Sequence, residues 1–292
     1  MDRLPREPPG QGTHAAKVHP CIVDGSGAVA HHAGTFPASI APPGCIEPAA
    51  SLRDTDFYWR QGNDVEMTVR GRIQKQSRLT PEMLIRAYAA GIFPMAERRD
   101  DPTVYWIDPD ERAILPFESF HVSRSLRRTV RRGTFDVRID TAFHTVIERC
   151  AEPAADRKDT WINRPILDTY SALHDLGFTH SVECWRNEEL VGGLYGVALG
   201  GAFFGESMFS RCTDASKVAL VHLVARLRAD GFRLLDTQFL TEHLSRFGVI
   251  TVSRRDYLTL LDDALEIQAQ FQPKPLLQRE LEVFLQSMTH TS

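Results

Sequence analysis

The chain has 292 residues, of which 42% are hydrophobic and 25% charged, and its formal net charge at pH 7 is −4. These values are ordinary for a soluble globular protein of one large domain or two modest ones. The mean hydropathy of −0.25 and the lack of any run of eighteen apolar residues exclude a membrane span. Five cysteines without a CxxC pair argue against a disulfide framework or a zinc cluster, so we expect a cytoplasmic protein that holds no metal.

Residues 1–66 differ in composition from the rest of the chain. Eight of the 17 prolines and four of the 11 histidines fall in the first fifty residues, and no apolar period runs through them. Such a segment buries too little apolar surface to offset the entropy of ordering it, so we expect a disordered leader. A start codon assigned upstream of the true one at Met67 would also produce this leader, and the sequence leaves that alternative open.

Residues 67–177 are expected to form a small α+β domain. Thr80-Pro81-Glu82 is typical of a helix start, because it combines a capping hydroxyl, a proline in the first turn and an acid near the positive end of the helix dipole. This helix ends before Gly91. The other elements predicted here are a strand at 103–107, a basic helix at 123–132, a strand at 134–139 and helices at 141–151 and 163–176.

Residues 178–270 follow a more regular pattern, which predicts a second domain of the GNAT acyltransferase type. The order of a strand meander, a helix, a parallel strand, a helix and a strand is the order of that α/β fold. The near-continuous apolar run at 232–238 predicts a central strand covered on both faces. The remaining elements are strands at 179–186, 189–199 and 202–210, a helix from Thr213 or Asp214 to Gly231, a helix at 240–247, an edge strand at 249–253 and a helix at 254–267, before a C-terminal tail at 271–292.

Two acids lie inside otherwise apolar strands and are the first candidates for chemistry. Strand alternation predicts that Glu206 shares a face with Met208, and that Asp236 shares a face with Gln238. A buried acid is costly unless it is paired or used, and both lie near strand ends, where open α/β sheets build ligand sites. The alternative is that each acid caps a loop amide or pairs with an arginine such as Arg211.

A basic helix is the second candidate. Within residues 121–138, six arginines against one aspartate leave a local charge of +5 in a chain of net charge −4. A basic face on an acidic protein is typical of a surface that binds a phosphate backbone, although a solvated helix face in an arginine-rich protein would look the same. The arginines of the helix recur at spacings of three and four and are Arg124, Arg127, Arg128, Arg131 and Arg132.

Two tryptophans, Trp106 and Trp161, are predicted in loops beside polar residues. Exposed aromatic rings near a basic stripe can stack on unpaired bases, whereas rings at a domain seam pack in the core, and both interpretations are open. The histidines show no HExxH or similar spacing, so no metal site is predicted.

Eight strings in order resemble the leucyl/phenylalanyl-tRNA–protein transferases over about residues 79–262. The most specific is GESMFSR at 205–211, followed closely by DASK at 214–217. The eight strings are GIFP at 91–94, HVSRS at 121–125, TWI at 160–162, HSVE at 180–183, LVGGLYG at 190–196, GESMFSR at 205–211, ASKVAL at 215–220 and DTQ at 236–238. Residues 1–66 have no counterpart in this resemblance.

The resemblance implies an enzyme of the bacterial N-degron pathway. Such an enzyme takes Leu or Phe, and sometimes Met, from aminoacyl-tRNA and joins it to the α-amino group of a protein that begins with Arg or Lys, which marks that protein for degradation. It also implies a catalytic domain similar to the GNAT fold, with no metal or nucleotide cofactor. We expect a monomer.

The resemblance also assigns roles by motif. Glu206, Asp236 and Gln238 match active-site positions, and Leu194 and Met208 match the apolar pocket for the donor side chain. The helix that carries Arg124, Arg127, Arg128, Arg131 and Arg132 matches a tRNA-contacting patch, and Trp161 matches a tryptophan near the terminal adenosine. Two positions depart from the family pattern: Tyr105-Trp106 replaces a frequent pair of tryptophans, and Leu194 replaces a frequent methionine.

These residues suit the aminolysis of an ester. Our hypothesis is that Asp236 orients and helps to deprotonate the amine, that the Gln238 amide positions the ester or its oxyanion, and that Glu206 forms the floor of the donor pocket. Two rival functions are an acyl-CoA-dependent GNAT acetyltransferase and a non-catalytic tRNA-binding module. The first would need a Gly/Arg-rich pyrophosphate loop at 210–216, which is absent from the sequence, and the second would leave the three polar residues dispensable.

Overall fold

The computed structural model describes residues 79–153 and 159–288, so the expected leader at 1–66 lies outside the described residues. The helices are α1 (Pro81–Ala89), α2 (Arg124–Arg131), α3 (Phe143–Cys150), α4 (Arg164–Asp175), α5 (Ala215–Ala229), α6 (Glu242–Ser245), α7 (Arg254–Leu265) and α8 (Gln278–Ser287). The strands are β1 (Phe93–Met95), β2 (Tyr105–Ile107), β3 (Glu111–Ile114), β4 (Asp136–Ile139), β5 (Thr179–Arg186), β6 (Glu189–Leu199), β7 (Ala202–Ser210), β8 (Leu234–Gln238) and β9 (Ile250–Ser253).

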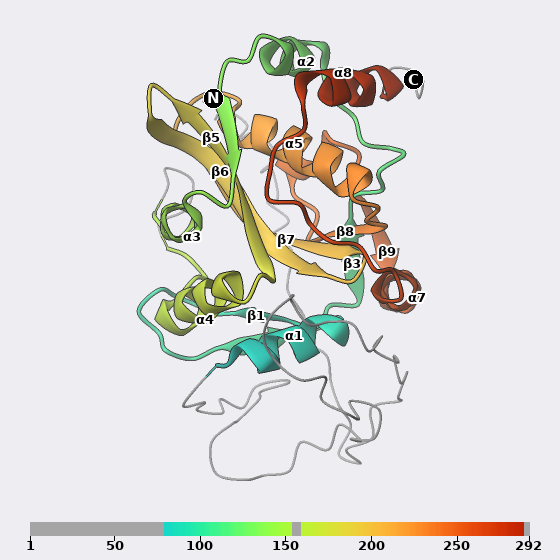
Figure 1. Cartoon of the computed structure of the whole chain (residues 1–292). Coiled ribbons are helices and arrows are strands. Elements are labelled where there is room, and N and C mark those ends of the chain that lie inside the picture. Colours follow the sequence, from blue (N-terminus) through green and yellow to red (C-terminus); the bar gives the residue numbers. More distant parts are fainter. Residues whose placement is uncertain (1–78, 154–158, 289–292) are drawn as a thin grey trace, which may run out of the picture.

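A single mixed sheet of seven strands organises the described part of the chain. Its strand order is β4-β5-β6-β7-β8-β3-β9, while β1 and β2 pair separately. β7 and β8 run parallel, with α5 as the crossover between them (Figure 1), and the other neighbours in the sheet are antiparallel. β3 and β4 come from the segment expected as the smaller domain, so the two expected domains share one sheet.

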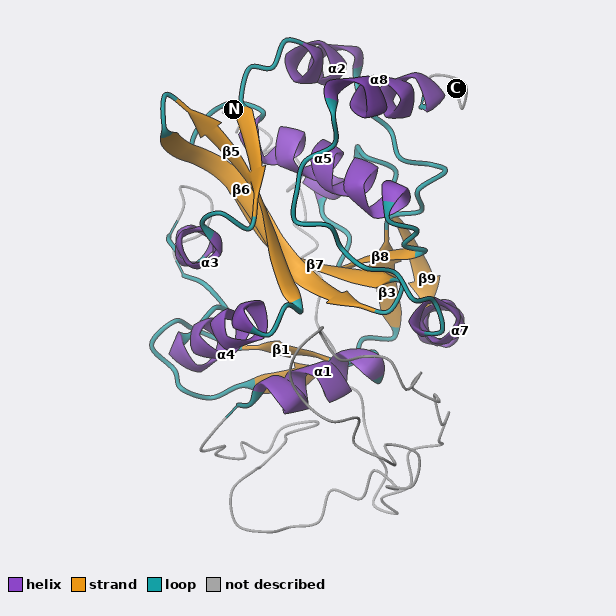
Figure 2. Ribbon diagram, viewed as in Figure 1, coloured by secondary structure: helices purple, strands orange, loops and turns teal. Residues whose placement is uncertain are grey.

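Helices cover both faces of this sheet, which gives the α+β architecture predicted from the sequence. α5 packs on one face, with α2 and α8 outside it, and α3 and α4 pack on the other (Figure 2). Each face has its own apolar core: Leu194 and Phe203 belong to the core on the α5 side, and Tyr195 and Phe204 to the core on the α3 side.

The central helix α5 is mostly buried because it lies between the sheet and the outer helices. Eleven of its 15 residues are buried, a pattern typical of a helix without a solvent face. Its first turn lies against β6 at Gly192, where an added Cβ would be 2.5 Å from the Cβ of Ala215. Glycine is therefore required at this point for the helix to reach the sheet.

The three central strands β5, β6 and β7 have the predicted bounds, and β9 is the predicted edge strand. The first helix begins as predicted, with the Thr80 side chain accepting a hydrogen bond from the backbone N–H of Met83 (3.3 Å). The sequence pattern did not predict β1, β3 or α8. The sequence of β3 is Glu-Arg-Ala-Ile, and its two charged residues are not typical of a strand, although β3 lies between β8 and β9. α8 forms inside the segment that was expected to be a C-terminal tail.

Candidate active site

The candidate active site lies where β7 and β8 part. Their parallel ladder joins Ala202–Phe204 to Leu234–Asp236 only, although β7 continues to Ser210. Glu206 and Met208 on β7 and Gln238 at the end of β8 therefore flank a stretch of β7 that has no strand neighbour on this side among the described residues. The carboxyl ends of adjacent parallel strands are the place where α/β sheets commonly bind ligands.

Asp236 is completely buried, and both of its carboxylate oxygens are engaged. Arg112 donates from Nε to Oδ1 (3.0 Å) and from Nη2 to Oδ2 (2.7 Å), and the Tyr257 hydroxyl donates to Oδ2 (2.8 Å). The backbone N–H of Gln238 donates to Oδ1 (2.8 Å). Asp236 thus pairs with an arginine, as one alternative from the sequence allowed, but the partner is Arg112 rather than Arg211.

Sequence reasoning missed Arg112, because it belongs to the unpredicted strand β3. Its guanidinium packs against the rings of Phe93 and Tyr257, with Cζ at 4.4 and 4.6 Å from the ring centres. Burial disfavours the charged guanidinium, but the neighbouring carboxylate of Asp236 outweighs this and raises the pKa of Arg112 above its ordinary value. The pair is therefore a buried ion pair.

Glu206 is held by two tyrosines from different helices. Tyr88 on α1 donates to Oε1 (2.6 Å), Tyr170 on α4 donates to Oε2 (3.1 Å), and the two phenol oxygens contact each other. Burial, with a smaller contribution from the charge of Asp236, raises the pKa of Glu206 to about 7, although the tyrosine hydrogen bonds oppose the shift. Glu206 therefore changes its charge near neutral pH.

A β-bulge at Glu206 makes one prediction wrong. Tyr195 pairs with Ser207 and Gly196 with Gly205, so Glu206 is an extra residue and the alternation of β7 is reset there. Glu206 contacts the tyrosines of the α3-side core, while Met208 packs against the α5-side core, so the two residues do not share a face.

The pairing of β8 with β3 contains a similar irregularity, which affects the prediction that Asp236 and Gln238 share a face. Adjacent residues of β3, Ala113 and Ile114, pair with Gln238 and Asp236, so simple alternation does not place Gln238 and Asp236 on one face. Gln238 also has a positive φ of 55°. Its side chain is nearly buried, at 7% exposed, and the amide Nε2 has no hydrogen-bond partner among the described residues. A buried amide donor without an acceptor is costly, which is typical of a group that a ligand completes.

The predicted donor-pocket residues Leu194 and Met208 lie opposite each other on β6 and β7. Leu194 is buried at 3% exposed, and Met208 is partly buried beside it. Cross-strand neighbours on one face are in side-chain contact range, so the structure brings this pair together on the α5 side of the sheet.

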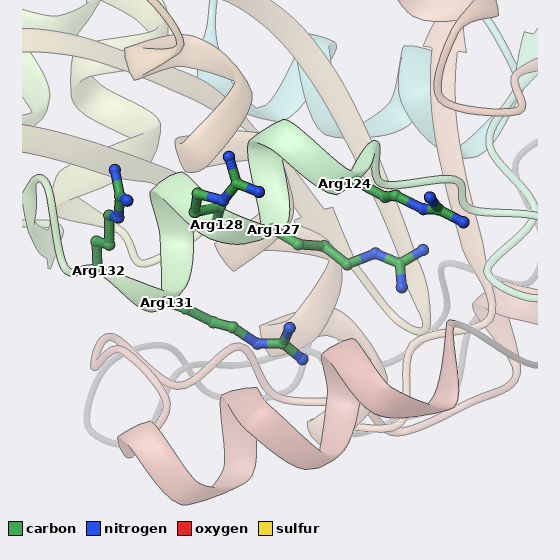
Figure 3. A pocket seen from close by; sticks show the side chains of 5 residues that line it. All are labelled: Arg124, Arg127, Arg128, Arg131 and Arg132. Atoms are coloured by element: carbon green, nitrogen blue, oxygen red, sulfur yellow. The ribbon is translucent and has the colours of Figure 1, made fainter.

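The arginines of α2 surround a surface cavity of about 330 Å³. Figure 3 shows Arg124, Arg127 and Arg131 projecting the same way from the helix, with Arg128 on another side and Arg132 at its end. Leu126 and Val130 bury the opposite face of the helix. Arg131 bonds to Glu282 of α8 (Nε to Oε2, 3.0 Å), so the C-terminal helix lies at the edge of this basic surface.

The two tryptophans differ in exposure. Trp106 is 5% exposed in β2 and belongs to the core, as the packing alternative predicted, whereas Trp161 is partly exposed. Within the described ranges, 79–153 and 159–288, no group of three or more His, Cys, Asp or Glu residues could hold a metal ion, and no helix there is long and apolar enough to cross a membrane.

Comparison with known proteins identifies the family. A family model described as leucyl/phenylalanyl-tRNA protein transferase matches residues 114–262, and the model of its N-terminal domain matches residues 77–110. A leucyl/phenylalanyl-tRNA–protein transferase of Paramagnetospirillum magneticum is 62% identical over 193 residues, which are 66% of this chain and 92% of that relative. One of Maricaulis maris is 57% identical over 211 residues, or 72% of this chain and 97% of that relative.

The mixed sheet, the polar site at the ends of β7 and β8 and these relatives define the protein as a transferase enzyme. The resemblance noted in the sequence strings is confirmed. The chain belongs to the leucyl/phenylalanyl-tRNA protein transferase family.

Proposed function

We propose that the enzyme transfers Leu or Phe, and sometimes Met, from aminoacyl-tRNA to the α-amino group of proteins that begin with Arg or Lys, and so marks them for degradation in the cytoplasm. The observation that carries the proposal is the opening beyond the β7–β8 ladder, where β7 carries Glu206 and Met208 and where β8 ends at Gln238. A partly accessible carboxylate, an unpartnered amide donor and an apolar side chain are the groups that aminolysis of an aminoacyl ester needs.

The tRNA binds to the basic surface in this proposal. Arg124, Arg128, Arg131 and Arg132 are exposed, Arg127 is half-buried, and five guanidinium groups around one cavity suit phosphate oxygens. The partly exposed ring of Trp161 is proposed to lie near the terminal adenosine. Trp106, which is in the core, would support that region by packing rather than by direct stacking.

The donor side chain is proposed to lie beside Leu194 and Met208. A pocket walled by these two residues accepts unbranched or γ-branched apolar groups and penalises β-branched ones by roughly 1–3 kcal/mol. Leu, Phe and Met are therefore expected as donors, and Val and Ile as poor ones.

The contacts of the two carboxylates support a different role for each. Both oxygens of Asp236 already accept hydrogen bonds from Arg112, Tyr257 and the Gln238 backbone. We therefore propose that Asp236 orients Gln238 and does not transfer a proton. Glu206, with a pKa of about 7, is matched to an α-ammonium of pKa 7.7–8.0 and is proposed to attract the cationic acceptor and take up its proton. The Gln238 amide then donates to the carbonyl oxygen of the ester as negative charge develops there. When the bond to the ribose oxygen breaks, the proton taken up by Glu206 passes to that oxygen and the tRNA leaves with a free hydroxyl.

The test is transfer of labelled Leu and Phe from charged tRNA to two peptides that differ only in a first residue of Arg or Ala. Transfer to the Arg peptide alone supports the proposal, and Ile-tRNA should be used much more slowly than Leu-tRNA. Labelled acetyl-CoA in place of aminoacyl-tRNA tests the acetyltransferase alternative. Binding of tRNA without any transfer would instead favour the binding module.

A further inference from the structure

We propose that Arg112 is a positioning residue for the transfer reaction: it holds Asp236 ionised and in one orientation, and Asp236 in turn fixes Gln238. The inference rests on the role proposed for Gln238. Arg112 touches neither substrate in this scheme, and its effect is transmitted through one carboxylate to one amide.

The first step is the fixation of the carboxylate. Asp236 is fully buried, and a buried carboxylate without a cation is neutralised or disrupts the fold. Arg112 donates to the carboxylate from two nitrogens, Nε and Nη2. This two-pronged geometry stabilises the ionised form of a carboxylate and also fixes its rotation. A lysine would supply the charge as a single point but not the fork.

The second step is the fixation of the cation. The third nitrogen, Nη1, donates to the backbone oxygen of Gly91 (2.9 Å), and the rings of Phe93 and Tyr257 pack against the guanidinium. These contacts come from two separate segments of the chain, residues 91–93 and α7. Rotation of the Arg112 side chain would break contacts to both.

The third step is the fixation of Gln238. A φ of 55° is unfavourable for a residue with a side chain and persists only where the surroundings hold it. The hydrogen bond from the backbone N–H of Gln238 to Oδ1 of Asp236 is such a restraint. It sets the direction in which Gln238 leaves the end of β8, and hence the direction of the unpartnered Nε2 donor.

The proposal predicts a distinctive pH profile. The titratable and charged groups around the ion pair are Tyr257 from α7 and Glu206 from β7. In Arg112→Met the buried carboxylate loses its cation, so its protonated form is favoured and it no longer holds Gln238 as an ionised acceptor. The pKa of Glu206 also rises in this variant, because Arg112 lowers it in the wild type. Single-turnover kcat should fall at least tenfold at pH 7 and recover partly towards pH 9, while KM for aminoacyl-tRNA changes less than twofold.

Two further variants separate positioning from simple charge balance. Arg112→Lys keeps the cation and should show the wild-type pH profile at an intermediate rate. The double variant R112M/D236N removes both charges, so it should fold even if R112M does not, and it should be slow at every pH without the new recovery at high pH. A wild-type rate in the double variant, or an unchanged pH profile in R112M, would overturn the proposal.

A matched control exists elsewhere in the fold. Arg226 on α5 and Asp230, the residue that caps the end of α5, form another nearly buried ion pair, with side chains 9% and 4% exposed. Arg226→Met should lower the unfolding temperature without adding a pH dependence to kcat. Gln238→Ala tests the proposed function separately: a full rate in that variant removes the role of Gln238 itself, whereas a slow Gln238→Ala beside an unaffected R112M removes only the role of Arg112.

Discussion

The folded state disfavours the ionised form of Glu206. Its pKa of about 7 lies above the value near 4.3 of an unfolded glutamate, because burial penalises the ionised form more than Tyr88 and Tyr170 stabilise it. Protonated Glu206 therefore favours the folded state. This contribution is fully present below about pH 4 and is lost as the pH rises through 7.

Glu206→Gln should remove this pH-dependent cost while keeping an oxygen for the tyrosine hydroxyls. Relative to the wild type, the variant is expected to be more stable at pH 8 by roughly 1–3 kcal/mol, and the difference should shrink towards pH 5. Urea unfolding at the two pH values measures it. An equal loss of stability between pH 5 and pH 8 in both proteins would contradict the assignment.

Single residues also show what the sequence can and cannot reveal about a site. Glu206 and Asp236 can be recognised from the sequence alone, because an acidic residue inside an apolar strand is unusual. Their partners Arg112, Tyr88 and Tyr170 lie 124, 118 and 36 positions away, and nothing in their local sequence marks them as partners. The bulge that turns Glu206 away from Met208 is equally invisible, because it depends on the register with β6.

At the scale of elements, α8 lies beside the basic helix α2 and beyond the region matched by the family models, which ends at residue 262. Glu282 of α8 pairs with Arg131 and so neutralises one arginine of the proposed tRNA surface. Because affinity for a nucleic acid depends on the number of available cations, this contact should weaken tRNA binding slightly.

Glu282→Gln should therefore strengthen tRNA binding by about twofold and steepen its salt dependence, since a partly exposed ion pair is worth at most about 1 kcal/mol. Filter binding of charged tRNA at several salt concentrations measures both effects. The matched control is Asp168→Gln on α4, where an exposed carboxylate bonds to Arg164 away from α2. A gain of the same size in the control would show only a general charge effect.

Elements were predictable to the extent that their signals are local. Alternating apolar runs and tight turns define β5, β6 and β7 to the residue, and Thr80 with Pro81 marks the start of α1. β3 forms because β8 and β9 on either side supply its hydrogen bonds, although its own four residues have little strand character. Tertiary pairing can thus impose a strand that propensity does not suggest.

At the scale of the whole molecule, the C-terminal segment completes the core on the α5 side of the sheet. Leu281, Phe284 and Leu285 of α8 are buried there, and the backbone N–H of Gln272 bonds to Asp230 at the end of α5 (2.8 Å). The segment expected as a tail is therefore a structural part of the described fold.

Leu285→Ala should destabilise the protein by about 2–4 kcal/mol, because Leu285 is completely buried and its truncation leaves a cavity. Val283 on the same helix is 62% exposed, so Val283→Ala should change stability by less than about 0.5 kcal/mol. Unfolding in urea compares the two. Similar small effects in both variants would mean that α8 is not docked in solution.

The open ladder at the end of β7 also has a consequence for hydrogen exchange. Beyond Phe204 no strand of the described chain pairs with β7 on the β8 side, so backbone amides of 206–210 that point that way have no sheet partner. Such amides exchange with deuterium quickly even inside a stable fold, whereas those that face β6 exchange slowly. A substrate that occupies the opening would slow the exchange of only those amides that face away from β6. Hydrogen exchange in β7 would then report whether the site is occupied, without any label on the substrate.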